Sequence, residues 1–183
     1  GLRYTCEPTM EIVDRVLHGT VNAALVGMMR ELGGRPFPLS GKFALRGEKV
    51  TTTDAETGAD LDLGLVGRVV NVDTQQIRWI LDRGEVPVIT PVAKSMDGQT
   101  LNINADMAAC EIAAHLKARK LVFLSDVPGV LRDPADESSL ISSIRRQDVE
   151  GLIRDGVLSG GMVPKVNSAA AAIDGGVSQV HMI

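Results

Sequence analysis

The stretch from Ser159 to Lys165 carries residue types that are expected beside a phosphate group. Gly160 and Gly161 let the backbone approach a ligand closely, because they have no side chain in the way. Pro164 suits the first turn of a helix, where free backbone N–H groups and the helix dipole favour an anion. Lys165 adds a positive charge beside that turn. The same residues are also typical of a Gly-Gly turn followed by an ordinary surface lysine, and spacing alone leaves both interpretations open.

A second group of polar residues lies in the stretch 102–116. Asn102 ends an extended segment, Asn104 is a good N-cap for the helix that follows, and Asp106 falls in its first turn. A strand would therefore deliver Asn102 and Asp106 to the mouth of a helix, where α/β folds usually bind ligands. In the alternative interpretation, which needs no ligand, Asn104 only caps the helix and Asp106 only complements its dipole.

Three further polar positions follow expected strands. Asp126 comes directly after the apolar run 120–125, at the edge of a sheet where ligands usually bind. Arg3 can hold a carboxylate through two parallel hydrogen bonds. Ser40-Gly41-Lys42 suits a loop beside a phosphate. Each position also has a plain structural interpretation, as a turn or a surface charge, and the sequence leaves these alternatives open.

The composition excludes several classes of protein. A length of 183 residues allows one ample domain or two small lobes, and a net charge of −4 argues against a nucleic-acid-binding surface. No apolar run approaches the ~18 residues that a membrane-spanning helix needs. Metal-type spacing is absent among the cysteines and histidines, and no nucleophile stands with a histidine and an acid. We therefore expect no zinc site and no hydrolytic triad. The cysteines and histidines of the chain are Cys6, Cys110, His18, His115 and His181.

Strands that alternate with helices predict an α/β fold, a three-layer αβα sandwich with a mostly parallel open sheet. Apolar residues at helical spacing predict a long first helix that ends at Leu32 before Gly33-Gly34 and is long enough to cross a subunit interface. Thr5 and Thr74 are the expected caps of the first two helices. The polar, irregular stretch 42–63 predicts a surface excursion or a ragged hairpin.

Six motifs follow one another along the whole chain. They are Gly1-Leu2-Arg3-x-Thr5, Leu39-Ser40-Gly41-Lys42, Asp62-Leu63-Gly64-x-Val66-Gly67, Asn102-Ile103-Asn104-Ala105-Asp106, Ser125-Asp126-Val127-Pro128-Gly129-Val130-Leu131 and Ser159-Gly160-Gly161-Met162-x-Pro164-Lys165. In this order they resemble the amino acid kinase family, and within it the members that act on N-acetyl-L-glutamate. The resemblance implies ATP-dependent phosphorylation of the side-chain carboxylate of acetylglutamate, with Mg²⁺, to an acyl phosphate. This reaction is the second step of arginine biosynthesis.

The resemblance also implies roles for individual residues. Lys165 matches the lysine that neutralises the transferred phosphoryl group, and Asp106 matches the aspartate that orients the catalytic lysines. Arg3 matches the arginine that grips the substrate α-carboxylate, and Asn102 matches the asparagine that binds acetylglutamate. No metal-ligating side chain is assigned. The residues expected to bind the nucleotide are Asp126, Val127, Pro128, Gly129, Val130, Leu131, Leu158, Ser159 and Met162.

By the same resemblance, residues 1–118 form an acetylglutamate-binding and oligomerisation lobe, and residues 119–183 form a nucleotide-binding lobe. The family has glycine-rich phosphate loops upstream of the position of Gly1 and a further strand segment after that of Ile183. We therefore expect this sequence to be a fragment of a longer enzyme with an incomplete amino acid kinase fold. We expect a homo-oligomer, a dimer or hexamer, in the cytoplasm and without nucleic acid or membrane; organelle targeting stays open.

Three alternatives remain open at the level of function. The first is a kinase-like, arginine-sensing domain of an acetylglutamate synthase, and the second is another carboxylate or carbamate kinase of the same family. The third is a non-catalytic assembly module that associates through the long first helix. The presence of both Asp106 and Lys165 favours a kinase over a sensor domain.

Overall fold

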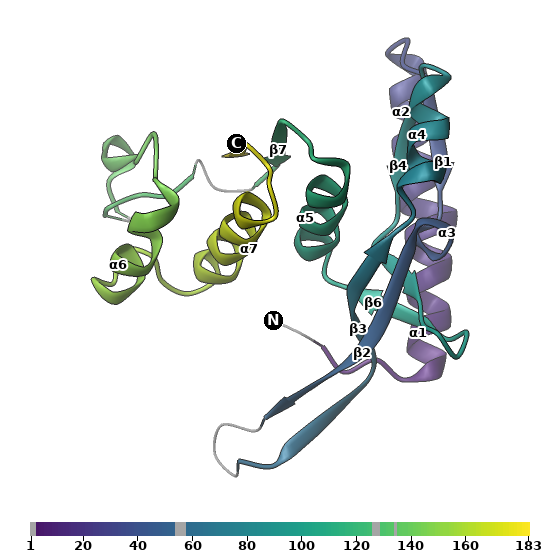
Figure 1. Cartoon of the computed structure of the whole chain (residues 1–183), viewed down its shortest axis with the longest axis horizontal. Coiled ribbons are helices and arrows are strands. Elements are labelled where there is room, and N and C mark those ends of the chain that lie inside the picture. The colour runs from purple at the N-terminus through teal and green to yellow at the C-terminus, as the bar shows by residue number, and fades with distance from the viewer. Residues whose placement is uncertain (1–2, 54–57, 126–128, 134) are drawn as a thin grey trace. The chain divides into compact units, whose positions relative to one another are not determined.

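The structure, a computed structural model, describes residues 3–53, 58–125, 129–133 and 135–183. Helices and strands alternate along the chain (Figure 1), and parallel strand pairs occur in both halves, which confirms the predicted α/β class with parallel strands. The chain forms two compact units, Gly1–Ala108 and Ala109–Ile183, and each is described by itself. The division into an acetylglutamate lobe and a nucleotide lobe concerns ligands and stays a prediction.

The first unit combines a long helix, a parallel strand pair and a small closed barrel. β1 and β4 form the parallel pair, and β2, β3, β6 and β5 form the barrel. The elements in chain order are α1 (Glu7–Asp14), η1 (Arg15–Asn22), α2 (Ala23–Glu31), β1 (Pro36–Leu39), α3 (Gly41–Ala44), β2 (Leu45–Thr53), β3 (Asp60–Val72), α4 (Thr74–Asp82), β4 (Val86–Ile89), β5 (Val92–Lys94), β6 (Thr100–Ile103) and the start of α5 (Ala105–Leu116).

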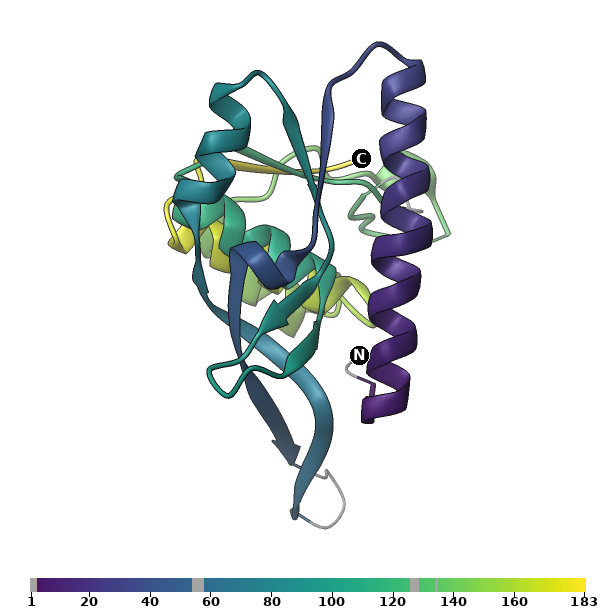
Figure 2. The same ribbon diagram turned by 90° about the vertical axis from the view of Figure 1, so that its right-hand side faces the viewer.

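The long helix of the first unit is continuous through α1, η1 and α2, as the apolar spacing predicted (Figure 2). Its middle segment, η1, is π-helical, so its turns are wider than those of the flanking α-helices. The buried side chain of Asn22 in this segment donates a hydrogen bond to the Val88 carbonyl of β4 at 2.7 Å. The helix stops where Gly33 adopts a φ of 80°, which confirms the expected end.

Two of the expected helix caps are wrong. Asp73, not Thr74, caps α4, and its carboxylate accepts hydrogen bonds from two backbone N–H groups of the first turn, both at 3.1 Å. Asp73 stands one residue earlier, and from there its carboxylate reaches both free donors. Cys6, not Thr5, occupies the N-cap position of α1, because Thr5 is held in a strand-like bridge.

β2 and β3 form one long antiparallel hairpin, which confirms the hairpin interpretation of the polar stretch 42–63. The strands pair from Leu45 with Val72 at the base to Thr53 with Asp60 near the tip, with two irregularities in register. Residues 54–57 lie outside the described residues. The hairpin is therefore longer and more regular than its polar composition indicated.

The second unit combines helices with one parallel strand pair, β7 and β8. Apart from the rest of α5, its elements are β7 (Lys120–Phe123), η2 (Glu137–Ser139), η3 (Arg146–Asp148), α6 (Val149–Arg154), α7 (Met162–Asp174) and β8 (Gln179–Met182). Small and apolar side chains of α5, α7 and the strand pair form one buried cluster: Cys110, Ala113, Phe123, Ala169, Ala172 and Val177. A second buried cluster lies between α6 and α7 and contains Val130, Val149, Leu158 and Val166.

Candidate functional site

The start of α5 has the local structure that the sequence predicted. The Asn104 side-chain oxygen accepts a hydrogen bond from the Met107 backbone N–H at 3.0 Å, so Asn104 is the N-cap. Asp106 is half-buried in the first turn, where its charge complements the helix dipole. β6 ends at Ile103, so one short connection delivers both Asn102 and Asp106 to the mouth of the helix.

Asn102 and Arg3 are brought together around the buried hydroxyl of Thr5. Asn102 lies in β6 between Val66 of β3 and Val92 of β5, and its Nδ2 donates to Thr5 Oγ1 at 3.2 Å. The same hydroxyl donates to the Arg3 carbonyl oxygen at 2.9 Å. The Arg3 side chain is exposed. Thr5 therefore links the Asn102 amide to the backbone of Arg3, and an arginine together with an amide suits a ligand with a carboxylate and further polar groups.

Lys165 lies in the second unit, one turn into α7. Its Nζ donates at 3.3 Å to Oγ of Ser125, two residues after the end of β7, and the side chain is half-buried. Gly161 stands at the N-cap of α7 and makes no side-chain cap, and Gly160 before it adopts a φ of 54°. The Met162 and Val163 N–H groups donate to the Ser159 and Gly160 carbonyl oxygens at 3.2 and 3.3 Å, so this helix start offers an anion the positive end of the helix dipole and the Lys165 cation. Asp106 belongs to the other unit, so its pairing with Lys165 stays a prediction.

The predicted nucleotide residues are only partly described. Asp126, Val127 and Pro128 lie outside the described residues. Among the rest, Gly129 has a φ of 135° and Val130 is buried. Leu158 is buried in the cluster between α6 and α7, Ser159 is exposed, and Met162 begins α7. Leu131 pairs with Leu140 through a single bridge. Their binding of a nucleotide stays a prediction.

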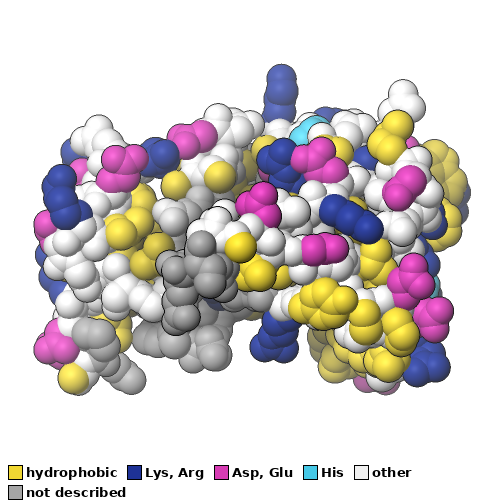
Figure 3. Space-filling model, turned by 90° about the horizontal axis from the view of Figure 1, so that it is seen from below, with side chains coloured by type: hydrophobic (Ala, Val, Ile, Leu, Met, Phe, Trp, Pro, Cys, Tyr) yellow, Lys and Arg dark blue, Asp and Glu magenta, His cyan; other side chains and the backbone are white. Residues whose placement is uncertain are grey.

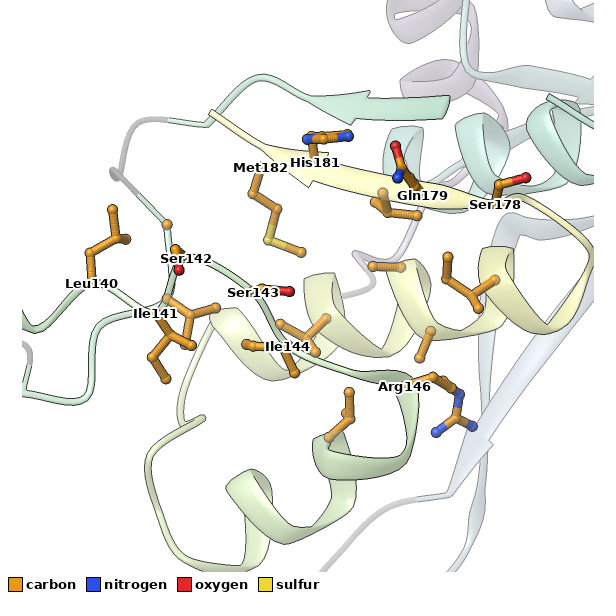
Figure 4. Close-up of a pocket in the computed structure, with 18 residues that line it drawn as sticks. Leu140, Ile141, Ser142, Ser143, Ile144, Arg146, Ser178, Gln179, His181 and Met182 are labelled. Atoms are coloured by element: carbon orange, nitrogen blue, oxygen red, sulfur yellow. The ribbon is translucent and has the colours of Figure 1, made fainter. Parts of the chain in front are cut away.

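The second unit contains a pocket of about 490 Å³ between α7, β8 and the segment 140–146 (Figure 4). Gly129 and Val130 line it, and so do Arg146 and His181. The Arg146 guanidinium binds both carboxylate oxygens of Asp174 at 3.0 Å, and this contact raises the pKa of Arg146. Sequence patterns do not predict this pocket, because its lining comes from four separate segments within 129–130, 140–149, 166–173 and 178–182. Leu158, Ser159, Met162 and Lys165 are not among its lining residues.

The stretch Ser40-Gly41-Lys42 has a structural role in the first unit. Lys42 Nζ lies 2.7 Å from an Asp14 carboxylate oxygen in the long helix. The Gly41 N–H donates to Thr90 Oγ1 at 3.1 Å, and a Cβ on Gly41 would lie 2.1 Å from the Val92 carbonyl oxygen. These contacts favour the turn interpretation over a phosphate loop, because the lysine is already paired.

Two features are absent from the described residues. These residues hold no group of three His, Cys, Asp or Glu side chains arranged to bind a metal. Over the same residues, none of the helices combines the length and the apolar character that a bilayer crossing requires.

The family model and the curated relatives that this chain resembles point to the same protein family. The model of the amino acid kinase family matches residues 2–183. The chain is 45% identical to an acetylglutamate kinase of Heliobacterium modesticaldum and 44% identical to one of Archaeoglobus fulgidus. Each match covers 100% of this chain and 64% of the relative. The chain thus spans about 64% of the length of these curated relatives.

Solved structures of similar fold include the protein smu.665 of Streptococcus mutans, with a TM-score of 0.82 and 29% identity. That match covers 100% of this chain and 70% of the other. An N-acetylglutamate synthase of Neisseria gonorrhoeae, complexed with coenzyme A and N-acetyl-glutamate, has a TM-score of 0.84 and 27% identity. It is matched over 100% of this chain and 40% of its own length.

Proposed function

The chain belongs to the amino acid kinase family, and from this premise we propose that its protein phosphorylates the side-chain carboxylate of N-acetyl-L-glutamate. ATP with Mg²⁺ is the phosphoryl donor, and the products are ADP and an acyl phosphate. The reaction is the second step of arginine biosynthesis. Relatives that are 44–45% identical and named acetylglutamate kinase support this substrate.

One observation carries the proposal: the Thr5 hydroxyl links Asn102 to the backbone of Arg3. The Arg3 guanidinium suits the α-carboxylate of the acceptor, because it offers two parallel N–H donors. The Asn102 amide offers both a donor and an acceptor for the remaining polar groups. Acetylglutamate has a carboxylate and an amide close together, so its chemistry matches this pair.

The chemistry needs charge neutralisation rather than a general base. The attacking carboxylate has an ordinary pKa of about 4.3 and is therefore ionised at neutral pH. A carboxylate oxygen forms a bond to the γ-phosphorus while the bond from that phosphorus to the β–γ bridging oxygen breaks, and ADP leaves. Two anions must be aligned and the charge on the phosphoryl group must be cancelled. We assign cancellation to Lys165 and the orientation of Lys165 to Asp106.

The nucleotide is assigned to the second unit. The positive end of the dipole of α7, the glycines before it and the Lys165 cation suit the negative charge of a polyphosphate. Mg²⁺ usually binds to substrate phosphates, waters and one or two carboxylates, so it needs no site made only of protein ligands. We further propose that residues 1–118 bind acetylglutamate, that residues 119–183 bind the nucleotide, and that the enzyme is cytoplasmic.

We also propose that the protein forms a homo-oligomer, a dimer or hexamer, through the long helix. Exposed hydrophobic side chains occur on the first unit, at the right of Figure 3. Along the helix, five of them are 42–52% exposed and follow at steps of four, five, four and three residues: Ile12, Val16, Val21, Leu25 and Met28. The step of five crosses the π-helical segment, whose wider turns keep such a step on one face. This apolar stripe suits packing against a second helix.

The main alternative is a sensor domain of the acetylglutamate synthase type. It is favoured by the TM-score of 0.84 to the synthase structure of Neisseria gonorrhoeae. A second structure of that synthase, complexed with coenzyme A and L-arginine, has a TM-score of 0.76 at 25% identity. A sensor domain would bind its ligand without turnover, and for that role neither Lys165 nor Asp106 would be needed.

The test is an assay of the full-length protein with ATP, Mg²⁺ and a panel of acceptors. We expect ADP release that depends on acetylglutamate, and trapping of the acyl phosphate by hydroxylamine as a hydroxamate. Glutamate and carbamate serve as competing acceptors. Preference for carbamate would identify a different kinase of the family. Binding of arginine without any ADP release would replace the kinase by the sensor alternative.

A further inference from the structure

We infer that Thr5 is a positioning residue for the acceptor: its buried hydroxyl sets the orientation of the Asn102 amide and the path of the backbone at Arg3. This inference rests on the proposed function, in which those two residues bind acetylglutamate. Thr5 itself is only 1% exposed, so it acts through its neighbours and does not contact the acceptor.

The orientation follows from the number of protons on a hydroxyl. Thr5 Oγ1 has one proton, and the Arg3 carbonyl oxygen at 2.9 Å can only accept a hydrogen bond. The proton is therefore directed to Arg3, and the lone pairs of Oγ1 remain for the Asn102 amide at 3.2 Å. Asn102 must turn its NH₂ group, not its oxygen, towards Thr5. Its Oδ1 and its second N–H are then left for other partners.

The backbone of Thr5 is fixed by β3, so the hydroxyl has a stable base. The Thr5 N–H donates to the Leu63 carbonyl at 3.0 Å, and the Leu65 N–H donates to the Thr5 carbonyl at 2.7 Å. Gly64 stands between these two contacts with a φ of 70°, and a Cβ there would lie 2.4 Å from the Thr5 carbonyl oxygen. The close approach needs glycine at 64. The hairpin strand β3 thereby clamps the residue that orients Asn102.

A valine at position 5 has nearly the shape of threonine but lacks the hydroxyl. In Thr5→Val, the Arg3 carbonyl loses its donor, and the Asn102 amide loses the acceptor that decides its rotation. We expect the KM for acetylglutamate to rise about tenfold or more, because one buried polar group becomes unsatisfied and the binding amide is no longer held. We expect the KM for ATP to stay within about twofold, because nucleotide binding is assigned to the other unit. Thr5→Ser retains the hydroxyl and restores acetylglutamate binding.

The deciding experiment combines these kinetics with NMR of the Asn102 side-chain amide in the full-length protein, assigned with Asn102→Asp. In the wild type, we expect slow solvent exchange of one Asn102 amide proton. Thr5→Val abolishes that protection and Thr5→Ser keeps it. An equal rise in both KM values, or no rescue by serine, would mean that Thr5 has only a general structural role and would overturn the inference.

The NMR measurement separates this inference from the proposed function. If the protein does not phosphorylate acetylglutamate, the function fails, whereas protection of the Asn102 amide still decides whether Thr5 orients it. If Thr5→Val does not fold, the wild-type spectrum decides: a freely exchanging Asn102 amide would overturn the inference on its own. Thermal unfolding of each variant is measured alongside, so that loss of fold is distinguished from loss of orientation.

Discussion

The ammonium of Lys165 lies 3.3 Å from the hydroxyl of Ser125, which ties a cation in α7 to the end of β7. Because ligands of α/β folds bind where strands end, this contact holds the charge at the expected edge of the sheet. This hydrogen bond fixes the position of the Lys165 ammonium group, although the lysine side chain is long and flexible. The contact also provides a graded test of the proposed mechanism.

We predict that Lys165→Ala lowers kcat by about 10²–10³-fold, with a smaller effect on KM, because the charge acts mainly on the transition state. Ser125→Ala should lower kcat by only about 2–10-fold, since it removes one hydrogen bond and leaves the charge. Both are measured by steady-state kinetics on the full-length protein. Lys120→Ala, an exposed lysine of β7, is the matched control and should be unaffected. An unchanged kcat in Lys165→Ala would remove this residue from the mechanism.

Much of the local structure was predictable because it depends on short-range patterns. Asn104 as the cap of α5, the helix stop at Gly33 and a strand within the apolar run 120–125, observed as Lys120–Phe123, follow from side-chain chemistry and periodicity over a few residues. The cap at Asp73 was missed because two adjacent residues are both good caps, and only geometry decides between them.

Features that depend on distant residues were not predictable. The parallel pairing of Val66 with Asn102 closes the small barrel, yet nothing in either strand specifies the other. Thr5 was in a recognised motif, but its contact with Asn102 spans 97 positions of sequence. The π-helical turn of the long helix is equally hidden, since a step of five residues appears as a break in a helical pattern.

Gly64→Ala should destabilise the protein more than Gly58→Ala. Both glycines have a φ of 70°, so alanine carries the same backbone strain at each position, about 1–2 kcal/mol. A Cβ meets nothing within 4 Å at Gly58, whereas at Gly64 it lies 2.4 Å from the Thr5 carbonyl oxygen. The additional loss at Gly64 should be about 1–3 kcal/mol in the free energy of unfolding, measured by urea titration. Equal losses at the two positions would show that the close approach of β3 to Thr5 is not tight.

Cys6 should react with alkylating reagents at a lower pH than an ordinary thiol. Its Sγ lies 3.0 Å from Thr9 Oγ1, and hydrogen bonds from the hydroxyl and the backbone N–H of Thr9 lower the pKa of the Cys6 thiol. A lowered pKa means more thiolate at a given pH, so the rate–pH curve for iodoacetamide moves to lower pH. Thr9→Val should move it back. Cys110, which is buried, should stay unreactive in the folded protein and serves as the internal control.

The apolar stripe on the long helix predicts which surface holds the proposed oligomer together. Leu25 is the fourth of the five stripe residues and is 44% exposed. Leu25→Glu places a charge there, and the cost of burying it against a second helix should raise the dissociation constant by about 30-fold or more. Analytical ultracentrifugation over a concentration series measures this shift. The matched control is Met96→Glu, in the turn between β5 and β6, where the side chain is 94% exposed and packs against nothing that a charge would disturb.

If both variants associate as the wild type does, the long helix is not the contact. If only Leu25→Glu dissociates, its helical content should stay unchanged in circular dichroism, because the exposed stripe residues are not the buried residues of this helix, Met10 and Val26.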